Sequence, residues 1–164
     1  MTGPKPGLGR PVRVGLISDT HGLLRPEALE FLAGCDHIVH GGDIGNPGIL
    51  DRLGELAPLT VVRGNNDRDA WARAIPVSAR LSFGSVSLYA IHDLKELDVD
   101  PVAAGVRVVV SGHSHRPLRV ERAGVLYINP GSAGRRRFSL PISAAELVIE
   151  GDNVRARIVT LVDG

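Results

Sequence analysis

The sequence lacks most of the features expected of a secreted, membrane-bound or nucleic-acid-coating protein. Its only cysteine, Cys35, can form neither an intramolecular disulfide nor a zinc-thiolate cluster, which favours a reducing compartment. Lysine and arginine total 19 against 18 acidic residues, so the basic surplus typical of non-specific nucleic-acid binding is missing. No run of about 18 apolar residues occurs, and the first ten residues hold no apolar signal segment. We expect a soluble, cytoplasmic protein with no membrane partner and no strong nucleic-acid partner; a homo-oligomer stays open.

Aromatic residues make up only 4% of the chain, whereas glycine (20) and proline (11) are abundant. This composition is typical of a globular protein with many tight turns and short loops. The length of 164 residues fits one domain with a sizeable core. Residues 1–10 contain three glycines and two prolines with almost nothing to bury, so we expect a flexible tail followed by a single domain over residues 11–164.

The first half of the chain alternates apolar runs with helix-like segments. We expect strands over residues 12–18 and 37–40, each followed by a loop and by a helix that begins at a proline, Pro26 or Pro47. A third strand is expected over residues 59–63. Crossovers of this length imply parallel strands in one sheet.

The second half favours strand pairs around turns. Residues 80–93 predict two strands around Gly84, and residues 106–110 predict a strand buried on both faces. Two further hairpins are expected over residues 118–129 and 144–161. The pattern therefore predicts a second sheet and an antiparallel C-terminal third.

Side chains suited to metal binding follow the expected strands directly. Each lies just beyond the carboxyl end of a strand, which is the edge where α/β sheets bind ligands. Two pairs are separated by one residue, a spacing that puts both side chains on the same side of an extended backbone. The seven candidate ligands are Asp19, His21, Asp43, Asn65, His92, His113 and His115.

These seven candidates exceed the three or four protein ligands that one transition-metal ion uses, so we expect two ions. Two ions at about 3.5–4 Å need a bridging carboxylate, and the flexible Gly41-Gly42 approach favours Asp43 for that role. The mixture of oxygen and nitrogen donors suits Mn²⁺, Fe²⁺, Co²⁺, Ni²⁺ or Zn²⁺, and the lack of thiolates argues against copper(I) and iron–sulfur chemistry.

Each motif alone also has a structural explanation. The segment Asp19-Thr20-His21 could be a turn or a helix cap, and residues 40–48 could be a turn only. The pair His113 and His115 after a buried strand is less common in purely structural loops. Their joint occurrence at successive strand ends is what favours a metal centre.

Five ordered motifs and His92 together resemble the calcineurin-like metallophosphoesterases, in particular their small single-domain phosphodiesterase branch in bacteria and archaea. The motifs are DTHG (19–22), GGDIGN (41–46), GNND (64–67), GHSH (112–115) and NPGS (129–132). The resemblance covers the chain from Pro11 onward and implies a four-layer α/β/β/α sandwich of two mixed β-sheets flanked by helices. It further implies that one metal is held by Asp19, His21, Asp43 and His115, and the other by Asp43, Asn65, His92 and His113.

The function implied by this resemblance is metal-dependent hydrolysis of small phosphodiesters, by attack of a hydroxide that bridges two divalent ions. We favour Mn²⁺ as the native ion. The predicted catalytic residues are Asp43, Asn65, Asn66 and His92. Asn66 stands where a widespread family motif has histidine, and both Asn66 and Arg137 are candidate substrate contacts. The alternatives are a phosphomonoesterase or nucleotide pyrophosphatase of the same fold, or a protein-interaction scaffold similar to the retromer subunit.

Three further positions have two interpretations each. His40 could orient a metal ligand or be a core histidine. Asp93, where the phosphodiesterase branch usually has glycine, could accept a hydrogen bond from a ligand imidazole or face solvent. The run Arg135 to Arg137 could contact a substrate phosphate or form a solvated loop.

Overall fold

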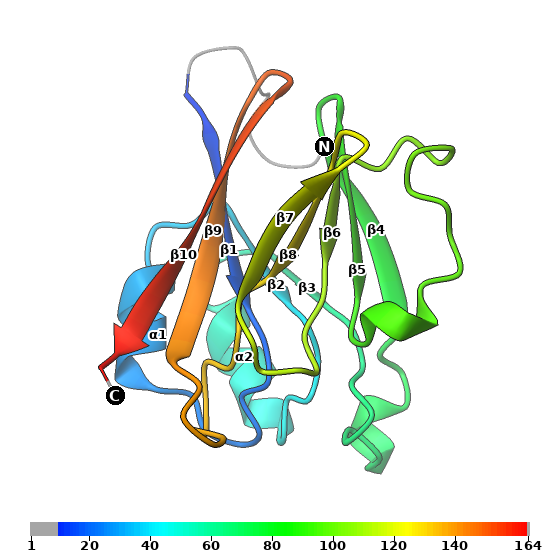
Figure 1. Ribbon diagram of the computed structural model, residues 1–164. Coiled ribbons are helices and arrows are strands. Elements are labelled where there is room, and N and C mark those ends of the chain that lie inside the picture. Colours follow the sequence, from blue (N-terminus) through cyan, green and yellow to red (C-terminus); the bar gives the residue numbers. More distant parts are fainter. Residues whose placement is uncertain (1–9, 164) are drawn as a thin grey trace.

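Two five-stranded β-sheets face one another in the computed structural model, which describes residues 10–163 (Figure 1). The first sheet has the order β10-β9-β1-β2-β3 and the second has the order β4-β5-β6-β8-β7. The strands are β1 (Val12–Ile17), β2 (His37–His40), β3 (Leu59–Val61), β4 (Ser78–Phe83), β5 (Val86–Ile91), β6 (Val108–Val110), β7 (Leu118–Arg122), β8 (Val125–Asn129), β9 (Ile142–Glu150) and β10 (Asn153–Val162).

The first sheet contains the parallel strands predicted for the first half of the chain. Strands β1, β2 and β3 run parallel and are connected by α1 (Pro26–Leu32) and α2 (Pro47–Gly54), each of which begins at the expected proline. The side chain of Asn46 caps α2 by accepting a hydrogen bond from the backbone N–H of Ile49 at 3.2 Å. The hairpin β9–β10 joins this sheet through antiparallel pairing of β9 with β1, so the last strands of the chain lie beside the first.

The second sheet is mixed. Strands β4 and β5 form the predicted antiparallel pair around Gly84, and β7 and β8 form another. Strand β6 lies between β5 and β8 and is parallel to both, with all three of its residues buried. The predicted strand over residues 106–110 is therefore shorter than expected but buried as expected.

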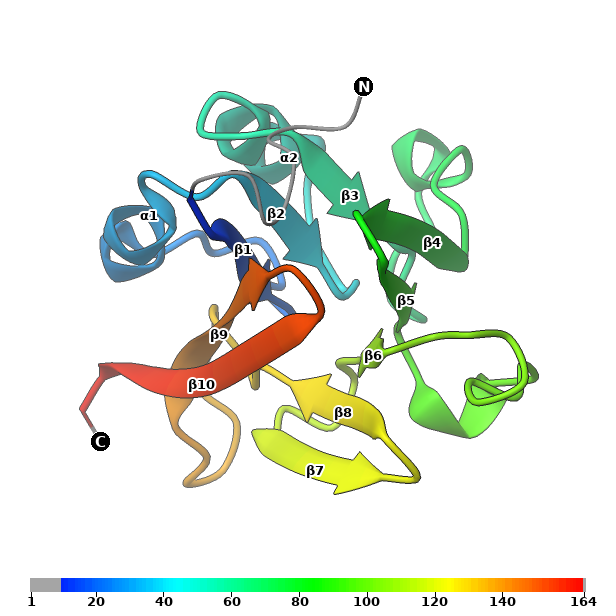
Figure 2. The same ribbon diagram turned by 90° about the horizontal axis from the view of Figure 1, so that it is seen from above.

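The main core lies between the two sheets. Alternate residues of β1, Val12, Val14 and Leu16, pack there against apolar side chains of the second sheet such as Leu88 and Val108. A separate cluster around Ile17 and Leu32 fills the space between the first sheet and its helices, which cover the outer face of that sheet (Figure 2). The two sheets thus hold each other in a fixed relative position, which also fixes the loops at their ends.

The outer face of the second sheet has a different cover. Within residues 10–163 both α-helices lie on the first sheet, and the second sheet is covered by the segment containing the 3₁₀ helix η2 (Leu94–Glu96). Leu94 and Ala104 of this segment pack on Val109 and Tyr127. The fourth predicted layer, expected to consist of helices on the second sheet, is therefore a loop with one short 3₁₀ turn.

The predicted tail, residues 1–10, lies outside the described residues except for its last member. Arg10 forms an ion pair with Asp36 at 2.8 Å. Within residues 10–163, no helix is long and apolar enough to cross a membrane.

Candidate metal centre

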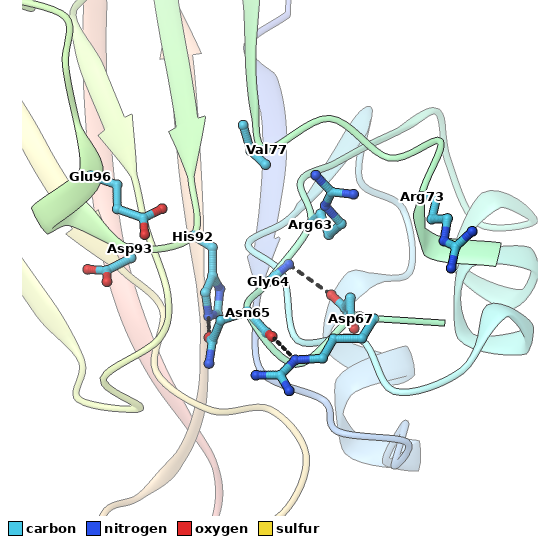
Figure 3. A pocket seen from close by; sticks show the side chains of 10 residues that line it. Arg63, Gly64, Asn65, Asp67, Arg73, Val77, His92, Asp93 and Glu96 are labelled. Carbon is cyan, nitrogen blue, oxygen red and sulfur yellow. Dashed lines mark hydrogen bonds between the residues drawn. The ribbon is translucent and has the colours of Figure 1, made fainter. Parts of the chain in front are cut away.

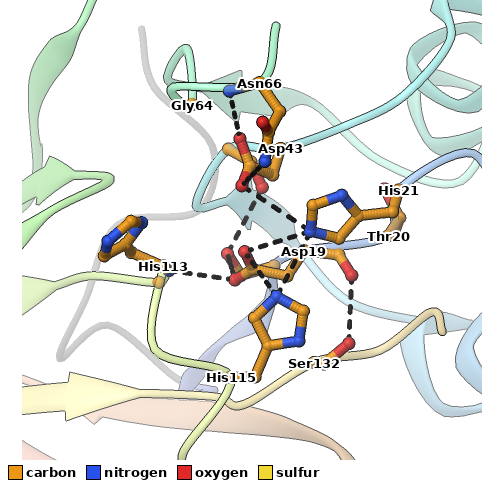
Figure 4. A network of polar contacts seen from close by, with 12 residues as sticks. Asp19, Thr20, His21, Asp43, Gly64, Asn66, His113, His115 and Ser132 are labelled. Carbon is orange, nitrogen blue, oxygen red and sulfur yellow. Dashed lines mark hydrogen bonds and ion pairs between the residues drawn. The ribbon is translucent and has the colours of Figure 1, made fainter. Parts of the chain in front are cut away.

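The strand-end loops of both sheets bring six potential metal ligands into two compact groups, and Figure 4 labels all of them except His92. In each group, one ligand atom of every member lies within 4.8 Å of the ligand atoms of the others. Each group combines loops of the first sheet with loops of the second, because the carboxyl ends of β1, β2, β5 and β6 meet at one end of the sandwich. The groups are Asp19, His21 and His115, and Asp43, His92 and His113.

The first group converges on one carboxylate oxygen. The Nε2 atoms of His21 and His115 lie 3.2 Å apart, and Oδ1 of Asp19 lies 3.7 Å and 3.4 Å from them, respectively. The other oxygen of Asp19, Oδ2, accepts hydrogen bonds from Ser18 Oγ at 2.7 Å and from the backbone N–H of His113 at 3.1 Å. These contacts turn Oδ1 toward the two imidazoles.

Oδ1 of Asp19 is buried and has no hydrogen-bond partner among the described residues. Burial alone would raise the pKa of Asp19, but the nearby imidazoles of His115 and His21 outweigh burial and hold the pKa well below its usual value. A buried, ionised oxygen without a partner is costly unless a cation neutralises it. One carboxylate oxygen with two imidazole nitrogens is a donor set that divalent transition metals favour, so these residues fit the predicted ion.

The second group includes the predicted amide ligand. Oδ1 of Asn65 lies 3.0 Å from Nε2 of His92 and 3.1 Å from Nδ1 of His113. Nε2 of His92 also lies 3.3 Å from Oδ2 of Asp43. All seven side chains predicted as ligands are therefore assembled at one end of the sandwich, and their roles as ligands stay predictions.

Asp43 lies between the two groups. Its Oδ2 atom is 3.6 Å from Nε2 of His21 in the first group and 3.3 Å from Nε2 of His92 in the second. Burial would raise the pKa of Asp43, but hydrogen bonds from His92 and from the backbone of Asn66 lower it on balance. An ionised carboxylate in this position has the geometry required of a bridging ligand.

The ligand loops have an unusual backbone. Positive φ angles are rare for residues other than glycine because the side chain crowds the backbone, and they cost of order 1–3 kcal/mol where packing imposes them. Five of the seven predicted ligands have a positive φ: Asp19 (56°), His21 (45°), Asp43 (57°), His113 (74°) and His115 (63°). The interpretation that the paired ligands lie on one side of an extended backbone is therefore wrong, because both members of each pair have left-handed backbone conformations.

Asp67 holds the loop of Asp43 in place, a role that the sequence did not predict. Its buried carboxylate accepts hydrogen bonds at 2.9 Å from the backbone N–H groups of Asp43, Ile44 and Gly64. The carboxylate thereby connects the loop after β2 to the loop after β3. The only sequence signal was its place at the end of the GNND motif.

Two glycines allow the loops to approach one another closely. A Cβ atom at Gly64 would collide with the carboxylate and backbone of Asp43, and one at Gly112 would collide with Ser18 and lie 2.7 Å from Asp19 Oδ2. Close backbone approach, and not turn geometry, is the reason for glycine at these positions.

His92 and His40 have opposite environments. His92 Nδ1 donates to the carbonyl of Gly41 at 2.7 Å, which leaves Nε2 facing Asp43. Burial lowers its pKa, but hydrogen bonding to Asp43 and the charge of Asp19 outweigh burial and raise the pKa to about 9.

His40 is fully buried, and burial lowers its pKa to about 4, so it is neutral at pH 7. Its Nδ1 accepts from the backbone N–H of Gly42 at 3.0 Å, so Nε2 carries the proton and donates to Thr20 Oγ1 at 3.0 Å. Thr20 in turn donates to the carbonyl of Ile44 at 2.7 Å. His40 is therefore a core histidine that also ties together the loops carrying the first and third predicted ligands.

The remaining predicted positions lie around the two groups. Asn66 is exposed, and its amide donates to Oδ2 of Asp43 at 3.1 Å. Asp93 lies 3.8 Å from Nε2 of His113, too far for a hydrogen bond, and accepts from the backbone of Lys95 instead. Arg135 donates to the carbonyl of His21 at 3.1 Å.

Arg137, the other candidate substrate contact, is exposed. It lies in the loop after β8, two residues beyond Arg135. No hydrogen bond joins its side chain to another residue of the described segment 10–163. Its proposed contact with substrate stays a prediction.

Comparison with known proteins agrees with this geometry. The calcineurin-like phosphoesterase superfamily domain matches residues 12–152, and the chain therefore belongs to that family. Two curated archaeal relatives are described as probable metallophosphoesterases. The protein of Methanothermobacter thermautotrophicus is 34% identical, over 89% of this chain and 91% of the relative, and that of Methanocaldococcus jannaschii is 31% identical, over 94% and 84%.

Solved structures confirm the fold. Vacuolar protein sorting 29 from Cryptosporidium parvum superposes with a TM-score of 0.81 at 21% identity, covering 94% of each chain. This likeness shows that the metallophosphoesterase fold predicted from the motifs is correct. The family membership makes the chain a probable metallophosphoesterase.

We expect Asp67→Asn to destabilise the protein by at least about 2 kcal/mol, because the amide NH₂ would oppose backbone N–H donors and leave them unpaired. The exposed neighbour Asp69, whose side chain caps no helix, provides the control Asp69→Asn. Urea unfolding of the two metal-free variants measures the difference. Equal stability of the two variants would contradict the role assigned to Asp67.

We expect metal binding to release a proton from His92 at neutral pH. The raised pKa means that His92 is protonated in the metal-free protein at pH 7, whereas a metal ligand must be neutral. The apparent affinity of the second ion should therefore increase, by up to about tenfold per pH unit, until pH reaches about 9. Calorimetric titration in buffers of different ionisation enthalpy counts the released protons. His92→Asn should reduce that count, and His37→Asn, outside both groups, should leave it unchanged.

Proposed function

We propose that the protein is a metal-dependent phosphodiesterase that uses two divalent ions, with Mn²⁺ favoured, to hydrolyse small phosphodiesters in the cytoplasm. The position of Asp43 Oδ2 between the two ligand groups is the observation that carries this proposal. Bound divalent ions polarise phosphoryl oxygens and lower the pKa of water toward neutrality. The family membership supports the phosphoesterase chemistry, and the arrangement of the side chains supports two ions.

The residues of the chain have separable tasks in this proposal. Asp19 and Asp43 supply the negative charge that holds the cations, and the four imidazoles complete their shells. The hydrogen bond from His92 Nδ1 to Gly41 and those from the backbone to Asp67 keep the donor atoms in fixed positions. Fixed donors cost no reorganisation during the reaction, which is the condition for strong electrostatic stabilisation.

Preference for diesters follows from Asn66. A histidine at this position could give a proton to a poor leaving group, whereas an amide has no titratable proton. The Asn66 amide also donates to Asp43, which commits one of its two donors to a predicted metal ligand. We therefore propose that the enzyme depends on leaving groups that depart without general-acid help.

A protein-interaction scaffold is the second candidate function. The structural similarity to a vacuolar protein sorting 29 favours the scaffold. The same fold can serve unrelated functions, so the fold by itself does not require an enzyme. The intact set of seven donor side chains favours the enzyme. Purified protein that binds no Mn²⁺ and hydrolyses no phosphate ester after Mn²⁺ addition would support the scaffold.

We expect the Mn²⁺-loaded protein to hydrolyse bis(p-nitrophenyl) phosphate, and Asp43→Ala to lower kcat/KM roughly tenfold further than Asn65→Ala. Asp43 contacts both ligand groups and Asn65 only one. Initial rates at saturating Mn²⁺ and the bound metal content of each variant provide the measurement. Near-wild-type turnover by Asp43→Ala would overturn the two-ion assignment.

We expect wild-type protein to prefer bis(p-nitrophenyl) phosphate over p-nitrophenyl phosphate, and its rate to depend steeply on the pKa of the leaving group. General-acid assistance contributes typically 10²–10⁴-fold, so Asn66→His should flatten this dependence and widen the substrate range. A series of aryl methyl phosphates of graded leaving-group pKa provides the measurement. Equal rates on aryl diesters and alkyl monoesters would remove Asn66 as the determinant.

A further inference from the structure

A cavity of about 420 Å³ opens beside the second ligand group (Figure 3). Asn65 and His92 form part of its wall, so a phosphate held at the metal centre would have one of its ester groups at the mouth of this cavity. The volume lies within the range of small-ligand pockets. The cavity is therefore placed to receive one arm of a diester.

Three arginines line this cavity: Arg63 and Arg68 in the loop after β3, and Arg73 at the end of the 3₁₀ helix η1 (Ala70–Ala72). Arg63 is half-buried, and its backbone N–H donates to the carbonyl of Pro76 at 2.8 Å. In the guanidinium group of Arg68, only Nε forms a hydrogen bond, which it donates to the carbonyl of Asn65 at 3.2 Å. Within residues 10–163, none of these three arginines forms an ion pair. The arginines that do are Arg10, Arg13, Arg52, Arg107 and Arg157.

The lining also contains three carboxylates, Asp67, Asp93 and Glu96, so its acidic and basic side chains are equal in number, but none of these carboxylates forms an ion pair with the three arginines. Asp67 is satisfied by backbone N–H groups, and Asp93 accepts from Lys95 and faces His113 on the metal side. Only Glu96, which is exposed, remains as an uncommitted carboxylate of the lining. Because none of the three guanidinium groups forms an ion pair in the described segment 10–163, their free N–H donors make the cavity a candidate site for an anion.

We propose that this cavity, the arginine pocket, binds a second phosphate carried by one alcohol group of the substrate. The inference rests on the proposed phosphodiesterase function. It narrows the substrate class to phosphodiesters that carry an additional phosphomonoester group, for example nucleoside 5′-diesters with a 3′-phosphate. A guanidinium group presents paired N–H donors that match phosphate oxygens. A phosphomonoester presents three terminal oxygens to these donors, one more than a carboxylate does.

Two chromogenic substrates that differ only in the second phosphate test this proposal: thymidine 5′-(p-nitrophenyl phosphate) with and without a 3′-phosphate. We expect kcat/KM of Mn²⁺-loaded wild type to be roughly tenfold higher for the 3′-phosphorylated substrate. Arg63→Gln and Arg73→Gln should each reduce this ratio toward one. Arg119→Gln, which removes one exposed charge from β7 outside the pocket, should keep both the ratio and the activity of wild type.

A binding measurement provides a second readout. Calorimetric titration should show tighter binding of thymidine 3′,5′-bisphosphate than of thymidine 5′-monophosphate, and Arg73→Gln should remove the difference. Hydrolysis of both chromogenic substrates at equal rates by wild type, or an equal loss of preference in Arg119→Gln, would overturn the arginine pocket and leave the phosphodiesterase standing. Hydrolysis of neither substrate would overturn the proposed function itself.

Discussion

The arrangement of the loops that carry the predicted metal ligands depends on the burial of two negative charges close together at one end of the sandwich. Asp19 and Asp43 are both buried, and each is kept ionised by donors that outweigh the cost of desolvation. Their mutual repulsion has to be offset by the imidazoles and by whatever cations the site holds. The left-handed backbone of five predicted ligands and the close approach of the glycines bring the donors together around these charges.

Most of the fold could be predicted from local patterns. Short-range signals include the prolines at the starts of α1 and α2 and the turn at Gly84. The structure confirms the helices and strands whose ends these residues mark. Pairing between distant segments has no such signal. The return of β9 to the edge of β1 depends on packing of residues more than 120 positions apart, such as the partners Leu16 and Ala145, and could not be derived from periodicity.

The candidate site was predictable as a set of side chains and less so as a geometry. Strand-end position was enough to identify the donors, because parallel strands present their carboxyl ends at one edge. It did not indicate how the donors are oriented, since a left-handed residue such as His113 leaves no mark in the sequence. Supporting residues were missed for a similar reason: the role of Asp67 depends on backbone N–H groups, which every residue except proline has.

Each ligand group takes members from both sheets: Asp19 and His21 meet His115, and Asp43 meets His92 and His113. An ion bound by such a group joins segments that are far apart in the chain, as a covalent crosslink would. The chain has a single cysteine and so no internal disulfide to serve this purpose. Metal occupancy would therefore act as a reversible crosslink that restricts the unfolded chain and holds the two sheets together at the loop end, in addition to the apolar packing between them.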